Sequence, residues 1–200
     1  MFIVKKILVI LLAFVLCFAG CSEEKVFVPE RGAVENGVYK NSAFGISFEA
    51  EPDWYYLTDS EIAQTMGIAA EEMFGEGTEI ESDHIYDMYC VDNKTNATVS
   101  VNYENVVSAG NITDEGTYLE IVTGQILSAG AVSGVADVVI GDVEIGGVKI
   151  PCLNIELEVS GTKIYEKIVA KQKGEWMCSI TLASLSETEM EELVGRISFE

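Results

Sequence analysis

Four segments in which apolar and polar residues alternate fill the C-terminal half of this chain, and short turns join them. The segments cover residues 137–145, 148–159, 163–171 and 176–183, and alternation with a period of two is typical of β-strands. Gly146 and Gly147 separate the first two segments. Such a pair favours a two-residue hairpin turn, because both positions adopt a positive φ at little cost. Connections this short join antiparallel neighbours, so the pattern predicts a four-stranded antiparallel meander.

Further strands and three helices are predicted ahead of and behind this meander. Alternating segments at 44–50, 54–57, 85–91 and 97–104 indicate strands, and the first two are expected to form a hairpin that buries Phe44, Phe48 and Trp54. Polar capping sequences at 58–61, 113–115 and 186–189 each precede an amphipathic stretch and predict helix starts. The resulting order, ββ-α-ββ-α-ββββ-α, predicts the α+β class, a mainly antiparallel sheet with helices packed on it.

One segment of the predicted first strand carries a family resemblance. Residues 39–48, read as Tyr-Lys-Asn-Ser-Ala-Phe-Gly-Ile-Ser-Phe, and the following Pro52, Asp53 and Trp54 resemble the opening of PsbP-like domains. The resemblance implies an antiparallel sheet sandwiched between helices, over residues 37–200 as a single domain. The family includes photosystem assembly and stabilising proteins, and many lipoproteins of Gram-positive bacteria look similar. A likeness of fold does not by itself supply a function.

The N-terminal residues 1–20 have the layout of a secretory signal peptide, with a basic pair, an apolar run and a small-residue end. The apolar run is shorter than the roughly 20 residues that span a bilayer. Residues 18–21 (Phe-Ala-Gly-Cys) resemble the bacterial lipobox. That resemblance implies cleavage between Gly20 and Cys21, and a diacylglycerol group on the sulfur of Cys21. Residues 21–36 then form a lipidated tether, and the chain is expected at the extracytoplasmic face of the cell membrane. Ordinary secretion, with Cys21 as a spare thiol, is the alternative.

The charge of the chain excludes several classes of partner. There are 33 Asp and Glu residues against 12 Lys and Arg, which gives a formal net charge of −21. Nucleic acids need basic residues to neutralise their phosphates, so no nucleic-acid partner is expected. Anionic lipid surfaces likewise attract basic rather than acidic segments. The membrane is therefore expected as a partner only through the lipid anchor, while envelope proteins are possible protein partners.

Few residues offer catalytic chemistry. His84 is the one histidine, no nucleophile motif lies near it, and there is no second histidine for a zinc site. We expect His84 to be an exposed residue at the start of a strand. After export, Cys90, Cys152 and Cys178 remain beside the lipidated cysteine, and their sequence does not decide between a disulfide and buried thiols, although buried small hydrophobes are favoured. A carboxylate pair of the glycosidase kind could be present, but 33 acids do not indicate which two.

The acidic stretch at residues 71–83 is the one candidate for a cation site. It surrounds a glycine-rich turn and offers several carboxylates, which Ca²⁺ prefers, but its spacing does not match an EF-hand loop. The loop at 92–96 also fails, because Lys94 stands where an oxygen ligand is needed. A solvated loop is therefore the favoured interpretation, and no metal or other cofactor is expected.

These observations predict a lipid-anchored extracytoplasmic protein without catalytic activity, which acts as a binding or accessory module for envelope proteins. The alternative from the sequence is an extracytoplasmic binder of a small ligand or of a cation such as Ca²⁺, with its cleft near residues 71–83.

The anchor prediction is tested by the change Cys21→Ser. The change leaves residues 37–200 untouched, so we expect the variant to fold as the wild type does. We also expect it to take up no radiolabelled palmitate and to keep its signal peptide uncleaved. Labelling of cells followed by immunoprecipitation measures both properties. Palmitate that still appears on the variant refutes Cys21 as the attachment site.

Overall fold

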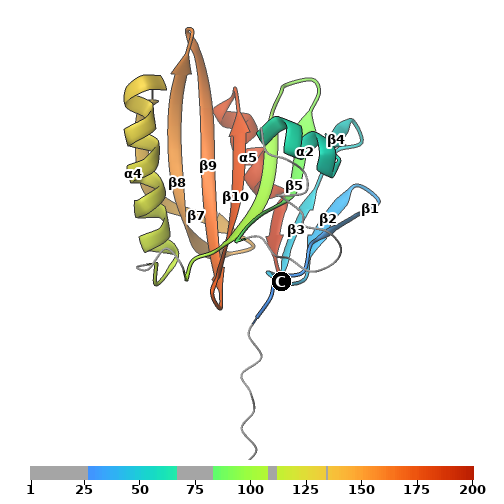
Figure 1. Ribbon diagram of the computed structural model, residues 1–200. Coiled ribbons are helices and arrows are strands. Elements are labelled where there is room, and N and C mark those ends of the chain that lie inside the picture. The colour runs from blue at the N-terminus through green and yellow to red at the C-terminus, as the bar shows by residue number, and fades with distance from the viewer. Residues whose placement is uncertain (1–26, 67–82, 108–111, 134) are drawn as a thin grey trace, which may run out of the picture.

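The computed structural model describes residues 27–66, 83–107, 112–133 and 135–200 (Figure 1). All strand pairings in this part of the chain are antiparallel, and the strands form two sheets. The large sheet has the order β4 (Trp54–Tyr56), β5 (His84–Asp92), β6 (Thr98–Asn105), β10 (Trp176–Ser184), β9 (Thr162–Lys173), β8 (Val148–Val159) and β7 (Val135–Ile145). The small sheet has the order β1 (Ala33–Glu35), β2 (Val38–Asn41), β3 (Ile46–Glu49) and β11 (Ile197–Phe199).

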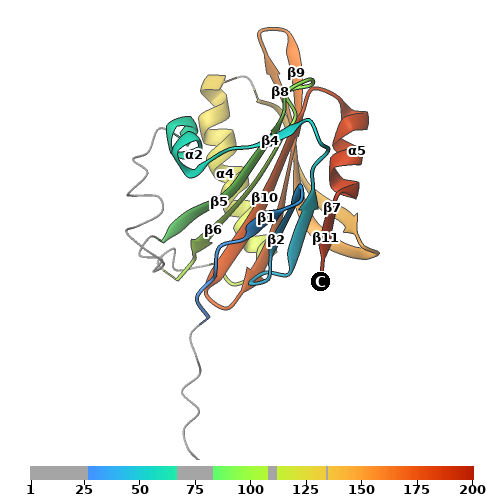
Figure 2. The same cartoon turned by 90° about the vertical axis from the view of Figure 1, so that its right-hand side faces the viewer.

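Three helices of the described residues cover the large sheet. They are α2 (Asp59–Met66), α4 (Glu115–Ser133) and α5 (Glu187–Gly195). Helices α2 and α4 lie on one face, while α5 and the small sheet share the other (Figure 2). The predicted α+β class, with helices on both faces of a mainly antiparallel sheet, is therefore confirmed. None of the helices within the described ranges is long and apolar enough to cross a membrane.

The meander forms as predicted, with strand ends that differ from the predicted ones by three residues or fewer. Gly146 and Gly147 have φ values of 61° and 81°, which is the left-handed region that a primed hairpin turn requires. The helix starts are confirmed as well. Ser186 caps α5 by accepting a hydrogen bond from the backbone N–H of Glu189.

The main core lies between the large sheet and the layer formed by the small sheet and α5. Tyr103, Cys178 and Leu182 contribute to it from the large sheet, and Phe48 and Leu193 contribute from the opposite layer. A second cluster lies beneath α4, where Tyr118 and Leu119 pack on β8, β9 and β10. A third, smaller cluster lies beneath α2. The described part of each predicted amphipathic face therefore buries its apolar residues against the sheet.

The expected hairpin of residues 44–50 and 54–57 does not form. Strand β3 pairs with β2 and β11 in the small sheet, whereas β4 pairs with β5 in the large one. The intervening Pro52 and Asp53 carry the chain from one sheet to the other. The burial expected for Phe44 and Phe48 is correct, and the ring of Trp54 still lies 5.7 Å from the ring of Phe48.

Part of the range assigned to the tether from the sequence packs on the domain. Strand β1 pairs with β2, and the ring of Phe27 meets the ring of Phe44 edge to face at 5.7 Å. The three residues of β1 are all exposed, so this strand shows no apolar alternation by which a sequence pattern would reveal it. Phe27 and the residues of β1 thus pack on the domain, although the sequence assigned them to the tether.

A buried carboxylate joins this N-terminal segment to both sheets. The side chain of Asp87 is fully buried. It accepts hydrogen bonds from the backbone N–H of Gly32 at 2.8 Å, from Asn41 Nδ2 at 3.1 Å, from Arg31 Nε at 3.3 Å and from the hydroxyl of Tyr39. Burial and the negative charge of Asp87 raise the pKa of Tyr39 far above its usual value, so the phenol stays a donor. This set of contacts compensates the cost of removing a carboxylate from water.

A β-bulge directs Asp87 into the core. The register between β5 and β6 shifts between Tyr86 and Met88, which leaves Asp87 as the extra residue. Met88 belongs to the main core and Tyr86 to the cluster beneath α2, so Asp87 and Met88 lie on the same side of the sheet. Arg31 also contacts Asp59 on α2, to which it donates two hydrogen bonds of 2.9 Å. These bonds hold the pKa of the Asp59 carboxyl below its ordinary value.

The structure predicts that Asp87→Ala is strongly destabilising. It leaves several buried donors without their acceptor, and we expect a loss of about 3 kcal/mol in the free energy of unfolding. Asp59→Ala is the matched control, because it removes a largely exposed partner of the same arginine and should cost no more than about 1 kcal/mol. Urea titration followed by circular dichroism measures both values. Equal losses in the two variants would contradict a central role for Asp87.

Candidate functional site

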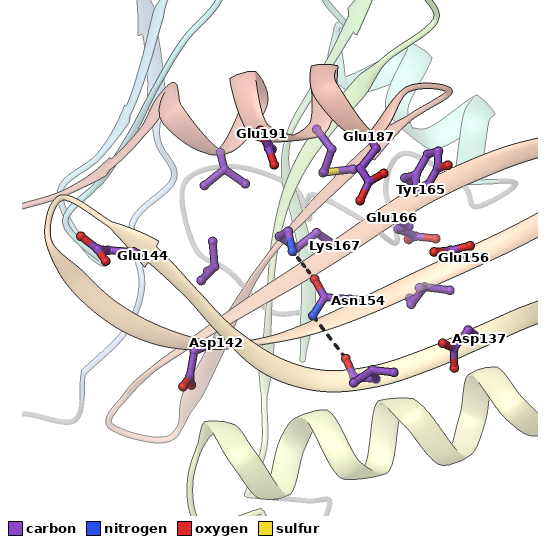
Figure 3. A pocket seen from close by; sticks show the side chains of 15 residues that line it. Asp137, Asp142, Glu144, Asn154, Glu156, Tyr165, Glu166, Lys167, Glu187 and Glu191 are labelled. Carbon is purple, nitrogen blue, oxygen red and sulfur yellow. Dashed lines mark hydrogen bonds between the residues drawn. The ribbon is translucent and has the colours of Figure 1, made fainter.

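A groove of about 590 Å³ lies between α5 and the strands β7, β8 and β9 (Figure 3). Helix α5 contacts β9 and β10, so β7 and β8 extend beyond the area that the helix covers. The helix is held in place by Met190 and Leu193, which are buried in the main core, and by the Ser186 cap at its start. The groove therefore results from a short helix placed on one side of a wide sheet.

Acidic residues dominate the lining of this groove. Among the lining residues are seven carboxylates and one cationic group, Lys167: the acids are Asp137, Asp142, Glu144, Glu156, Glu166, Glu187 and Glu191. Strand register separates them by face. Asn154 pairs with Lys167 on the side of α5, whereas Ile155 pairs with Glu166 and belongs to the cluster beneath α4. The same alternation places Asp137 and Glu156 on the side of α5, opposite Glu187 and Glu191.

The one lysine of the groove is held by a neutral neighbour. Lys167 Nζ donates to Asn154 Oδ1, and Asn154 Nδ2 donates to the backbone carbonyl of Val139 at 3.4 Å (Figure 3). Within the described residues, no ion pair links Lys167 to any of the acids around it. The positive charge is thus fixed at the floor, and the carboxylates on the two walls keep their negative field.

Glu166 lies on β9 at the edge of this arrangement, on the face that carries α4. It makes no hydrogen bond or ion pair to another described residue, and burial raises the pKa of its carboxyl. An ionised carboxylate without a donor is costly in such a place, so Glu166 is better suited to be neutral than its exposed neighbours are.

Of the residues and segments singled out from the sequence, several lie outside the described residues. Gly20 and Cys21 are among them, and so is the acidic stretch 71–83 except for Asp83. Within the ranges that the structure describes, no three His, Cys, Asp or Glu side chains come together as a metal site would require. In the 92–96 loop, Asp92 accepts from the backbone N–H of Lys94 at 2.8 Å and from the hydroxyl of Thr95 at 2.9 Å, so its carboxylate stabilises its own turn.

The large sheet separates His84 from the three cysteines. Cys90, Cys152 and Cys178 are free and fully buried, and all three belong to the main core. His84 is half-buried rather than exposed as expected. It precedes the core residue Ile85 and so lies on the opposite face, where its ring is 4.6 Å from that of Tyr86. A Cys–His pair is therefore not formed by these residues.

Burial also suppresses the reactivity of the thiols. It raises the pKa of Cys90 to about 12, raises that of Cys178 well above its ordinary value, and raises that of Cys152 despite the opposing charge of Lys167. The interpretation of the cysteines as small hydrophobes is therefore confirmed. The groove itself was not predicted from the sequence, although three acids in residues 137–144 and the acids at 187 and 191 were visible there.

No protein-family model and no curated protein matches this sequence. Among solved structures, the chain is similar to cyanobacterial PsbP (CyanoP) from Synechocystis, with 9% identity, coverage of 91% of this chain and 99% of that one, and a TM-score of 0.49. It is also similar to LpqN, described as involved in cell envelope biogenesis of Mycobacterium tuberculosis, with 13% identity, coverage of 76% and 82%, and a TM-score of 0.41. At these values the likenesses assign neither a family nor a function, and the PsbP-like resemblance stays a prediction.

The thiol environment predicts a labelling result. In the folded protein expressed without residues 1–20 and with Cys21→Ser, we expect Cys90, Cys152 and Cys178 to resist a maleimide reagent at pH 8, because each is buried and protonated. Unfolding in guanidinium should expose all three, and mass spectrometry counts the adducts in both states. Rapid modification of any of them in the native protein would show an accessible thiol and would reopen the possibility of thiol chemistry.

Proposed function

We propose that this chain is a lipid-anchored, extracytoplasmic binding module without catalytic activity, and that its acidic groove takes a basic, extended segment of an envelope protein. The observation that carries this proposal is the groove's charge. Carboxylates from α5 and from the strands face each other across it, while Lys167 is engaged by Asn154. A concave site with one sign of charge concentrates its field and attracts the opposite charge from a distance.

The open edge of the large sheet supports an extended partner. Strand β7 has 11 residues and is the last strand in the order, so no described strand pairs with its outer edge. Such an edge pairs readily with an added strand, in which main-chain hydrogen bonds give affinity and side chains give specificity. Val139 and Ile140 on this strand are 50% and 43% exposed, and they offer apolar contact to alternate side chains of the partner.

The acids of β7 also determine which strand can add. Asp137, Asp142 and Glu144 line one strand, so two copies of this edge would bring like charges together. Charged residues on an edge strand are a common protection against self-association. The same charges favour a segment in which Lys or Arg alternates with apolar residues. The acids on β7 thus disfavour pairing between two copies of this edge and favour pairing with a basic strand.

The proposed lack of catalytic activity is supported by where the candidate catalytic side chains lie among the described residues. The cysteines are buried and protonated, and His84 lies across the sheet from them and from the groove. The carboxylate of Asp92 is used by its own turn, and that of Asp87 by the buried network. Anchoring through Cys21 would keep the groove at the membrane surface, where envelope proteins are at high effective concentration.

The proposal predicts that reversing the groove's charge abolishes binding. We expect an alternating Lys–Val peptide to bind the wild-type protein in calorimetry, more weakly as salt is added, and to bind Glu187→Lys/Glu191→Lys at least about tenfold more weakly. The matched control is Glu30→Lys/Glu35→Lys, which makes the same change in net charge on exposed residues of the N-terminal segment.

Equal weakening in both double variants would mean that net charge alone attracts the peptide, and it would overturn the groove as the site. A pull-down from membranes with the lipid-anchored protein as bait tests the cellular role. Recovery of nothing above an inert lipoprotein control would contradict an envelope partner.

A further inference from the structure

The two central strands of the large sheet carry polar side chains on one face. On β6 and β10, the residues Tyr103, Cys178 and Leu182 face the main core, so their neighbours along each strand face the side of α4. Those neighbours include Asn102, Glu104, Ser179 and Thr181. Ser179 is buried and the other three are half-buried. Polar side chains that are largely buried at the middle of a sheet are unusual on a surface that only packs against a helix. They therefore indicate a binding site.

These side chains form the floor of a cavity of about 420 Å³ beside α4. The helix provides an apolar wall with Ile121 and Val122, and Ile168 on β9 extends it. The cavity is lined by residues of α4 and the acidic groove by residues of α5. These two helices lie on opposite faces of the large sheet (Figure 2), so the sheet separates the two sites. Its volume is within the range of small-molecule sites, about 300–1,000 Å³.

The floor keeps unused hydrogen-bonding capacity. Asn102 Nδ2 donates to Ser179 Oγ at 2.9 Å, which leaves the amide oxygen of Asn102 for another partner. The hydroxyl of Tyr118 donates to one oxygen of Glu104 at 2.6 Å, which leaves the second oxygen. Thr181 also lines the cavity and makes no side-chain hydrogen bond to any described residue. The cavity floor therefore offers donors and acceptors close together. A ligand hydroxyl needs both, because it donates one hydrogen bond and accepts others.

The charge of the lining excludes an anionic ligand. Within the described residues, neither lysine nor arginine lines the cavity, so a phosphate or carboxylate would find no counter-ion. The one ionisable carboxylate, Glu104, is bound by Tyr118, and burial together with that charge raises the pKa of the phenol. A neutral molecule with an apolar face and a polar edge matches the apolar wall and the polar floor.

From this geometry we propose that the cavity binds a neutral polyhydroxylated ring of the sugar class, with its C–H face on Ile121 and Val122 and its hydroxyls on Asn102, Ser179 and Thr181. The imidazole of His84 lines the same cavity and adds a flat side chain against the ring. This site is separate from the groove and from the peptide proposed for it, so each can fail without the other.

The experiment titrates glucose, N-acetylglucosamine and cellobiose into the 15N-labelled protein and follows the amide resonances of β6 and β10. Thr181→Val and Gln125→Ala are the test variants. Both residues line the cavity, and neither makes a side-chain hydrogen bond to a described residue, so the fold does not depend on them. Each should weaken sugar binding about fivefold, the value of one net hydrogen bond. Thr98→Val is the matched control, since Thr98 is on β6 but does not line the cavity.

Saturable shifts confined to the cavity, weakened in the two test variants and unchanged in the control, support the site. No saturable shift with any of the three sugars overturns the proposal. It is also overturned if the test variants bind as the wild type does, or if inorganic phosphate binds and the sugars do not. The Lys–Val peptide should bind all three variants equally, because it is directed to the opposite face of the sheet.

Discussion

The hydrogen bonds to Asp87 join the N-terminal segment and the small sheet to the large sheet. A carboxylate within the protein must find donors, and it finds them in Gly32, Tyr39 and Asn41, residues of the N-terminal segment and of β2. The small sheet is thereby fixed against β5 and cannot slide along the large one. The small sheet shares its face of the large sheet with α5, which contacts β9 and β10. The groove lies beside α5, where β7 and β8 extend beyond the helix.

Local periodicity accounts for what the sequence could predict. The meander and the three helices were found because each carries its pattern within about ten residues and ends at a turn or a cap. The small sheet was missed because its strands are three or four residues long and β11 pairs with β3 across most of the chain, as Ile197 does with Phe48. The hairpin expected between β3 and β4 failed for a related reason. Alternation predicts that a segment is a strand, but not which sheet it joins.

The candidate site was hidden from the sequence in a different way. In a chain with 33 acids, Asp137, Glu156, Glu187 and Glu191 have no distinguishing signal, and only the packing of α5 on the sheet brings them together. Alternation then separates the chemistry of the two faces. Asn154 and Lys167 face α5, on the same side of the sheet as the three buried cysteines, while Asn102 and Ser179 face α4. A single sheet thereby carries an acidic groove on one side and, on the other, a polar cavity whose described lining has neither lysine nor arginine.

The position of Phe27 gives the proposed anchor an orientation. Six peptide steps separate it from Cys21 and span at most about 20 Å even when fully extended, so the tether is shorter than residues 21–36 implied. Phe27 lies over Gly174, with Lys173 above its ring at 4.9 Å, so the lipid would hold the turn between β9 and β10 near the membrane. Lys167, at the floor of the groove, lies six residues further along β9, or about 20 Å. An anchored molecule would therefore present its acidic groove away from the lipid headgroups, where the basic segment of a neighbouring protein can reach the edge of β7.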